Sequence, residues 1–144
     1  MRPLSLVALI LLMVSVAAAG TTQHMHHSHG THEITNYNMP PEVTLEIFKD
    51  AKSGYNIHLK TKNFRFAPEL VNTSPMEGSG HAHLYVNKKK YRLYAPWFHL
   101  PKIPKGEVTI HVELCANTHD VLTVHNKRVE DKRLITAKGN IVTP

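Results

Sequence analysis

The sequence predicts an all-β protein, an antiparallel β-sandwich of about seven strands. Short segments alternate apolar and polar residues, and this alternation is typical of half-buried strands. In residues 42–49, for example, Val43, Leu45 and Ile47 fall on one side of such a strand. No segment shows a convincing helical stripe, so strands are expected throughout the folded part.

The predicted strands follow one another at short spacing between residues 42 and 137. In order they cover residues 42–49, 54–61, 81–87, 90–95, 107–114, 121–125 and 133–137. Glycine, proline and serine separate several of them and favour turns. The clearest breaks are Ser53 with Gly54, the stretch from Pro75 to Gly80, and Lys105 with Gly106.

The N-terminus is typical of a secretory signal peptide, assigned to residues 1–19. Arg2 precedes an apolar run that ends in three alanines, Ala17 to Ala19. The run is shorter than the roughly 20 apolar residues that span a bilayer comfortably. We therefore expect a periplasmic or secreted protein with no membrane anchor after cleavage.

Cleavage leaves 125 of the 144 residues, which is enough for one domain with a modest core. The domain is assigned to residues 42–144. The one cysteine excludes an internal disulfide framework. The formal net charge of +6 comes from scattered lysines and arginines, with one lysine cluster at residues 88–90. Nucleic acid is therefore not expected as a partner.

Residues 20–41 form a histidine-rich tail that has few aliphatic side chains and is expected to be mobile. Imidazole and thioether groups bind copper, zinc or nickel. The alternative is a low-complexity segment with adventitious affinity. The candidate ligands in the tail are His24, Met25, His26, His27, His29 and His32.

A second set of candidate ligands lies in "GHAHLYVN", where His81 and His83 are two residues apart. Residues i and i+2 of a strand point to the same face, roughly 6.5–7 Å apart at Cα. Two imidazoles at this spacing can bind one ion. Because Ala82 and Leu84 occupy the core face, the two histidines are expected on the less apolar face. A solvated strand face can also carry two histidines that have no function.

His99 is the expected third ligand. A tight turn with Lys88 and Lys89 at its tip would pair Tyr85 with Arg92. This register would bring the segment "APWFHLP", and with it His99, back to the start of the strand that carries the paired histidines.

Cys115 and His119, in "CANTHD", suggest comparison with blue-copper sites. Such sites normally have a downstream methionine, and no methionine follows Met76. From the residues alone, the path of the connector at 97–106 leaves open whether His119 reaches the paired histidines. Three further histidines are expected to be polar strand residues without a metal role, and these are His58, His111 and His125.

Together, "GHAHLYV", "PWFH" and "NTH" resemble the Gly-His-x-His-x-Tyr-Val, Pro-Trp-Phe-His and Asn-x-His pattern of a family of small exported bacterial β-sandwich proteins. The resemblance covers most of residues 42–130. Members look cupredoxin-like and are often labelled copper-binding or uncharacterised. The resemblance implies a site of four histidines, His81, His83, His99 and His119. The sequence departs from the pattern at Lys88, Ala95 and Cys115.

We therefore expect an exported protein that binds a metal ion, copper first and zinc second, for storage, delivery or tolerance. A metal-handling protein is the expected partner. Binding should weaken as the pH falls through about 6.5, because ligation requires neutral imidazole. The alternatives are a metal-independent, immunoglobulin-like interaction module and a zinc hydrolase or hydratase. No general acid or base is evident, so no enzyme activity is expected.

Overall fold

The structure of the protein is a computed structural model that describes residues 30–138 and 141–143. The signal peptide predicted at residues 1–19 lies outside the described residues. Five of the predicted tail ligands also lie outside them, namely His24, Met25, His26, His27 and His29.

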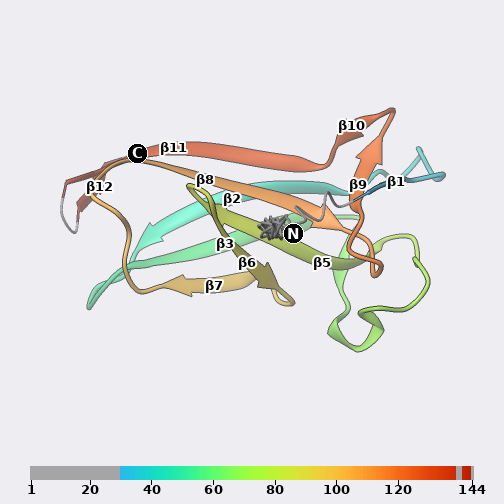
Figure 1. Cartoon of the computed structure of the whole chain (residues 1–144), viewed down its shortest axis with the longest axis horizontal. Coiled ribbons are helices and arrows are strands. Elements are labelled where there is room, and N and C mark those ends of the chain that lie inside the picture. The colour runs from blue at the N-terminus through green and yellow to red at the C-terminus, as the bar shows by residue number, and fades with distance from the viewer. Residues whose placement is uncertain (1–29, 139–140, 144) are drawn as a thin grey trace, which may run out of the picture.

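The described chain is all-β and forms two sheets (Figure 1). The small sheet is antiparallel and contains, in spatial order, β2 (Glu42–Lys49), β3 (Tyr55–Lys62) and β7 (Trp97–Leu100). The main path of the large sheet runs through β6 (Lys89–Leu93), β5 (Ser79–Val86), β8 (Gly106–Cys115), β11 (Glu130–Lys138) and β12 (Ile141–Thr143).

Shorter strands join the large sheet near the start of β5 and the end of β8. They are β1 (Thr31–Glu33), β4 (Arg65–Phe66), β9 (Val121–Val124) and β10 (Lys127–Arg128). A single 3₁₀ turn, η1 (Pro68–Leu70), lies between β4 and β5.

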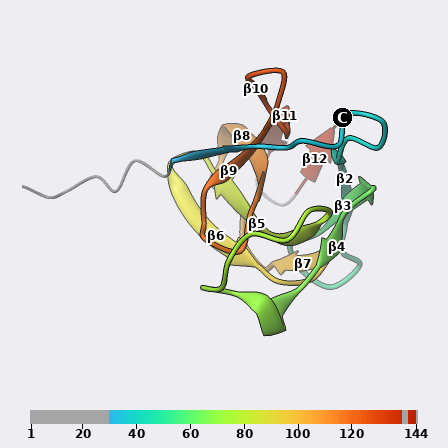
Figure 2. The same cartoon turned by 90° about the vertical axis from the view of Figure 1, so that its right-hand side faces the viewer.

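The core lies between the two sheets, which face each other in the end-on view of Figure 2. Alternate residues of β8 point inward, and Val108, Ile110 and Val112 are fully buried. Ile57 and Leu59 of β3 are fully buried on the opposite side. Each such aliphatic side chain contributes about 1.5–3 kcal/mol by burial. The alternation seen in the sequence therefore predicts the core faces of both sheets.

The all-β prediction is confirmed, and each of the seven predicted strands has a counterpart. These are β2, β3, β5, β6, β8, β9 and β11. The structure adds five strands of two to four residues, too short for a pattern of alternation to reveal. The large sheet is mixed rather than purely antiparallel, because β1 runs parallel to β9 and β4 runs parallel to β5.

Part of the predicted mobile tail belongs to the fold. In β1, His32 lies beside Leu122 of β9, and Ile34 just after β1 is buried. Among the described residues, no helix is long and apolar enough to cross a membrane.

The hairpin between β5 and β6 differs from the predicted one by two residues. Its loop consists of Asn87 and Lys88, and Tyr85 pairs with Lys90 rather than with Arg92. Asn87 takes a left-handed φ of 53°, and its side chain accepts a hydrogen bond from the backbone of β8. Asparagine tolerates this conformation better than most residues, so the turn forms at Asn87. The predicted register was therefore wrong.

Candidate metal centre

Strand β5 places His81 and His83 on the same face of the large sheet, opposite the core-facing Ala82 and Leu84. The antiparallel register sets His81 directly across from Cys115 of β8. Directly paired residues of an antiparallel ladder point to the same face. The pairing therefore brings a thiol to the two imidazoles.

Gly80 allows β5 and β8 to approach closely at this point. A Cβ atom on Gly80 would lie 2.0 Å from the carbonyl oxygen of Cys115, far inside van der Waals contact. The backbone of Gly80 also accepts a hydrogen bond from Ala67, 2.8 Å long. Glycine is therefore required where three chain segments converge beside the cluster.

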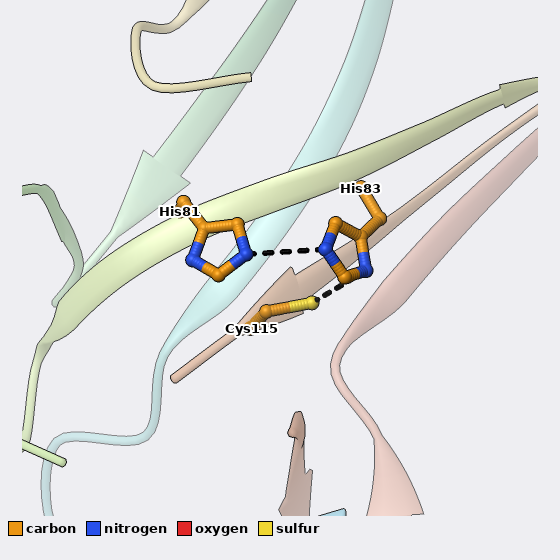
Figure 3. Close-up of side chains that lie close together, drawn as sticks. All are labelled: His81, His83 and Cys115. Carbon is orange, nitrogen blue, oxygen red and sulfur yellow. Dashed lines mark hydrogen bonds between the residues drawn. The ribbon is translucent and has the colours of Figure 1, made fainter. Parts of the chain in front are cut away.

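Three buried side chains from the neighbouring strands β5 and β8 meet on this face of the sheet (Figure 3). His81 Nε2 lies 3.1 Å from His83 Nε2, and Cys115 Sγ lies 3.2 Å from His83 Nδ1. Their exposed fractions are 1%, 0% and 0%. One potential ligand atom from each lies within 4.8 Å of the others. These histidine and cysteine side chains are grouped so that they could hold a metal ion.

His119 reaches the same cluster from the loop between β8 and β9. Its Nδ1 lies 2.9 Å from His81 Nε2, and the two ring centroids are 4.5 Å apart. The backbone of His119 is left-handed, with φ of 73°, and its N–H donates to the carbonyl of Ala116. The tight turn that follows β8 therefore carries His119 back to the paired histidines.

Asn72 contacts the other side of the His119 ring. Nε2 of His119 lies 2.9 Å from Oδ1 of Asn72. A carbonyl oxygen only accepts hydrogen bonds, so Nε2 carries the proton and Nδ1 has the lone pair. The lone pair of His119 Nδ1 therefore faces His81.

His81 Nε2 thus has a close nitrogen on two sides, one from His83 and one from His119. A neutral ring nitrogen carries either one hydrogen or one lone pair. If His81 Nε2 is bare, it faces the bare Nδ1 of His119 and can accept a hydrogen only from His83 Nε2; if it is protonated, its one hydrogen can be donated to His119 Nδ1 or to a bare His83 Nε2. A cation bound by these nitrogens would take up their lone pairs.

The burial of His81 and His83 excludes the solvated strand face, which the sequence left open as the alternative to a ligand pair. The ring centroid of Tyr94 lies 5.6 Å from that of His81, and η1 packs against β5. The backbone N–H of Asn72 donates to Asn117 and fixes this segment against the loop after β8. Chain segments distant in sequence therefore cover a strand face that alternation alone assigns to solvent.

Burial controls the protonation of the cluster in the metal-free protein. It raises the pKa of the Cys115 thiol to about 12, and the negative charge of Glu113 adds to this effect. Burial also lowers the pKa of His119, with smaller contributions from the positive charges of Arg92 and Lys90. At neutral pH the thiol is therefore protonated and the His119 imidazole is neutral.

Two of the separations in the cluster are close to those of ligands on one tetrahedral metal ion. Two nitrogens bound to one ion at about 2.0–2.1 Å lie about 3.3 Å apart in this geometry. The separations from His81 Nε2 to His83 Nε2 and to His119 Nδ1, 3.1 and 2.9 Å, differ from that spacing by a few tenths of an ångström. His119 is not in the group whose ligand atoms all lie within 4.8 Å of one another, which consists of His81, His83 and Cys115. Asn117, two residues before His119, is fully buried, and neither of its amide atoms has a hydrogen-bond partner in the described structure. A bound ion or water is the usual partner of such atoms.

His99 does not lie at this cluster. It is exposed on β7 in the small sheet, where it pairs with Asn56 of β3, and its Nδ1 lies 2.9 Å from Asn56 Oδ1. The predicted proximity to His81 was wrong, because β6 ends at Leu93 and the chain then crosses to the other sheet.

Two of the histidines that were predicted to have no metal role make ordinary surface contacts. His58 Nδ1 lies 2.8 Å from a carboxylate oxygen of Glu46 on the neighbouring strand. His125 stacks on Tyr37, with ring centroids 4.2 Å apart. Neither belongs to the groups of potential metal ligands within the described residues.

His111 belongs to a second group of potential ligands, with Glu113 and Glu130. Its Nε2 lies 3.0 Å from Glu130. The buried Glu113 carboxylate already binds the guanidinium of Arg128 and the hydroxyl of Tyr85. Because a cation is in place here, this group is better described as an ion-pair network than as a metal site.

Two residues of the site were not assigned to it from the sequence. Cys115 was considered only with His119 as a blue-copper ligand, although pairing residues 79–86 with 106–115 would have set it opposite His81. Asn72 gives no signal, because it lies in a loop 47 residues from its partner His119.

A comparison with known protein families, curated proteins and solved structures finds no match to this chain. The resemblance to an exported bacterial family therefore stays a prediction, and the geometry alone supports the function proposed below.

Proposed function

We propose that this protein binds one copper ion through His81, His83, His119 and Cys115. The single observation that carries the proposal is the close approach of two imidazole nitrogens, His83 Nε2 and His119 Nδ1, to His81 Nε2, with the buried Cys115 thiol 3.2 Å from His83 Nδ1. Neutral imidazoles and a thiolate provide lone pairs that a cation can bind. His99, which the sequence suggested as a ligand, is not part of the proposed site.

Copper is preferred over other metals because of the chemistry of the donors. Thiolate and imidazole are soft to intermediate ligands that suit copper(I) and zinc, and copper stands highest among the divalent first-row metals. Lys90 and Arg92 act on His119 as nearby positive charges. Copper(I) with the Cys115 thiolate adds no net charge beside them, whereas a divalent ion adds one. Zinc remains the alternative.

The cellular role extends the same proposal. An exported protein with a folded copper site serves storage, delivery or tolerance in the periplasm or outside the cell, and hands its ion to a metal-handling partner. The histidines of residues 20–32 supply a second, weaker site. A cupredoxin-like relationship is part of this proposal, and its support is the two-sheet architecture with a histidine and cysteine cluster at the end of β8.

The decisive test is elemental analysis of the mature protein without an affinity tag. Deleting the whole tail would remove β1 and the buried Ile34. The tail is therefore silenced by replacing His24, His26, His27 and His29 with alanine, and the product is called the tail-silent chain. We expect this chain to retain one copper per molecule after exhaustive dialysis. Complete loss of metal from the tail-silent chain would refute the site between the strands.

A second expectation concerns pH. Protons compete with copper for the imidazole lone pairs, and binding also displaces the proton of the Cys115 thiol. Because burial lowers the pKa of His119 below its ordinary value of about 6.5, this imidazole stays neutral as the pH falls through 6.5. Copper should therefore be retained at pH 7.5 and 6.5 and lost by about pH 5. Equal copper content of the tail-silent chain at all three pH values would contradict ligation by histidine.

A further inference from the structure

An asparagine in the loop between β4 and β5 is joined to the cluster in two ways. Asn72 follows η1, and its backbone N–H donates to the carbonyl of Asn117 at 2.8 Å. Its side-chain oxygen lies 2.9 Å from His119 Nε2. The backbone bond and the side-chain bond both end on the short loop that carries His119. The side chain of Asn72 is therefore held in place by its own backbone contact.

The backbones of both partners are left-handed, a conformation that asparagine tolerates and that histidine adopts less often. Asn72 has φ of 64° and His119 has φ of 73°, in the left-handed region that most side chains avoid. The turn at Asn72 is closed by Thr73, whose N–H and hydroxyl both donate to the carbonyl of Leu70. Non-glycine residues held in this region cluster at functional sites. Two of them in direct contact, at a group of potential ligands, indicate a geometry that the fold maintains.

We infer that Asn72 is a positioning residue that makes His119 a metal ligand through Nδ1. The inference rests on the proposed metal binding and adds to it the tautomer and orientation of one ligand. The Asn72 carbonyl accepts the Nε2–H hydrogen, which keeps the lone pair on Nδ1 and keeps that atom 2.9 Å from His81 Nε2. Hydrogen bonds of this kind fix ring orientation and raise ligand basicity.

The test compares glycine substitutions at two left-handed asparagines in the tail-silent chain. Asn72→Gly removes the carbonyl that holds His119 and keeps a residue that accepts positive φ without strain. Asn63→Gly is the matched control, because Asn63 has φ of 51° and bonds Pro40 instead. Asn72→Asp preserves an acceptor at the same place, since a carboxylate cannot donate.

Copper affinity is measured by competition with a chromophoric chelator. We expect Asn72→Gly to weaken affinity by about 10–100-fold, the usual effect of losing such a partner. Asn63→Gly should stay within about twofold of the tail-silent chain, and Asn72→Asp should restore affinity. Equal affinities of the two glycine variants would overturn the role of Asn72 and leave the proposed copper site standing.

A metal-free measurement separates the two ideas further. Two-bond ¹H–¹⁵N NMR correlations of the apo tail-silent chain should show His119 protonated at Nε2 and bare at Nδ1, and Asn72→Gly should lose this pure tautomer. Protonation at Nδ1 would refute the inference whatever the copper result. If neither the tail-silent chain nor its variants bind copper, the proposed function fails, while the tautomer still decides whether Asn72 orients His119.

Discussion

Replacing His119 by asparagine should weaken copper binding at least about tenfold, whereas the same substitution at His99 should leave it unchanged. The reason is position: His119 Nδ1 lies 2.9 Å from His81 Nε2, and His99 lies on the other sheet, bonded to Asn56. Asparagine is chosen because it tolerates the left-handed backbone at residue 119 and provides no imidazole. The affinity of each variant in the tail-silent chain is measured by chelator competition.

This pair of variants also separates the structural site from the site that the sequence resemblance implies. Both exchanges remove one imidazole, so any general effect of losing a histidine cancels between them. Thermal unfolding of the metal-free variants serves as the folding control. An affinity loss for His99→Asn as large as that for His119→Asn would contradict the arrangement of the two sheets around the cluster.

The second large effect is expected for Gly80→Ala, which should destabilise the fold by about 3 kcal/mol or more. The new methyl group would lie 2.0 Å from the carbonyl oxygen of Cys115 and 3.1 Å from its carbonyl carbon. The clash is with backbone, so no side-chain rotation relieves it, and β5 must separate from β8. Because this separation moves His81 away from Cys115, copper affinity should fall as well. Urea denaturation of the metal-free protein measures the loss of stability.

Gly106→Ala is the matched control for this substitution. Gly106 begins β8 with φ of 91°, and nothing lies within 4 Å of an added Cβ. Its replacement carries only the conformational penalty of a left-handed side chain, about 1–2 kcal/mol, and leaves the cluster untouched. If Gly80→Ala proves no less stable than Gly106→Ala, the tight approach of β5 and β8 is not a determinant of the fold.

Features that depend on neighbouring residues were predicted from the sequence, whereas features that depend on contacts between distant segments were not. Period-two alternation in residues 42–49 and 107–114 correctly identified strands and their core faces, because facing one core is a local property. The placement of His81 and His83 on one face of a strand was predicted for the same reason, because it depends only on their spacing of two residues. The register of the hairpin after Val86 was missed by two residues, since it depends on which residue accepts a left-handed φ.

The rest of the site depends on contacts between distant segments. Cys115 lies opposite His81, a residue more than 30 positions earlier in the chain, through the pairing of β5 with β8, and no local pattern encodes that register. His99 was placed wrongly because nothing around residues 94–96 marks the crossing from one sheet to the other. The full burial of the paired histidines could not be read from the sequence, because η1, which packs on β5, and Asn72, which contacts His119, belong to a segment without regular alternation.

The parallel pairing of β1 with β9 affects how a metal ion would pass from the N-terminal histidines to the proposed site. Gly30 accepts a hydrogen bond from the N–H of Val121, two residues after His119. The backbone hydrogen bond therefore holds Gly30, the residue that follows His29, next to the loop that carries His119. Short tethers raise the effective concentration of an attached group to the millimolar range. Under the proposed function, an ion bound by the imidazoles of His24 to His29 would therefore meet the buried ligands of the same molecule far more often than those of another protein.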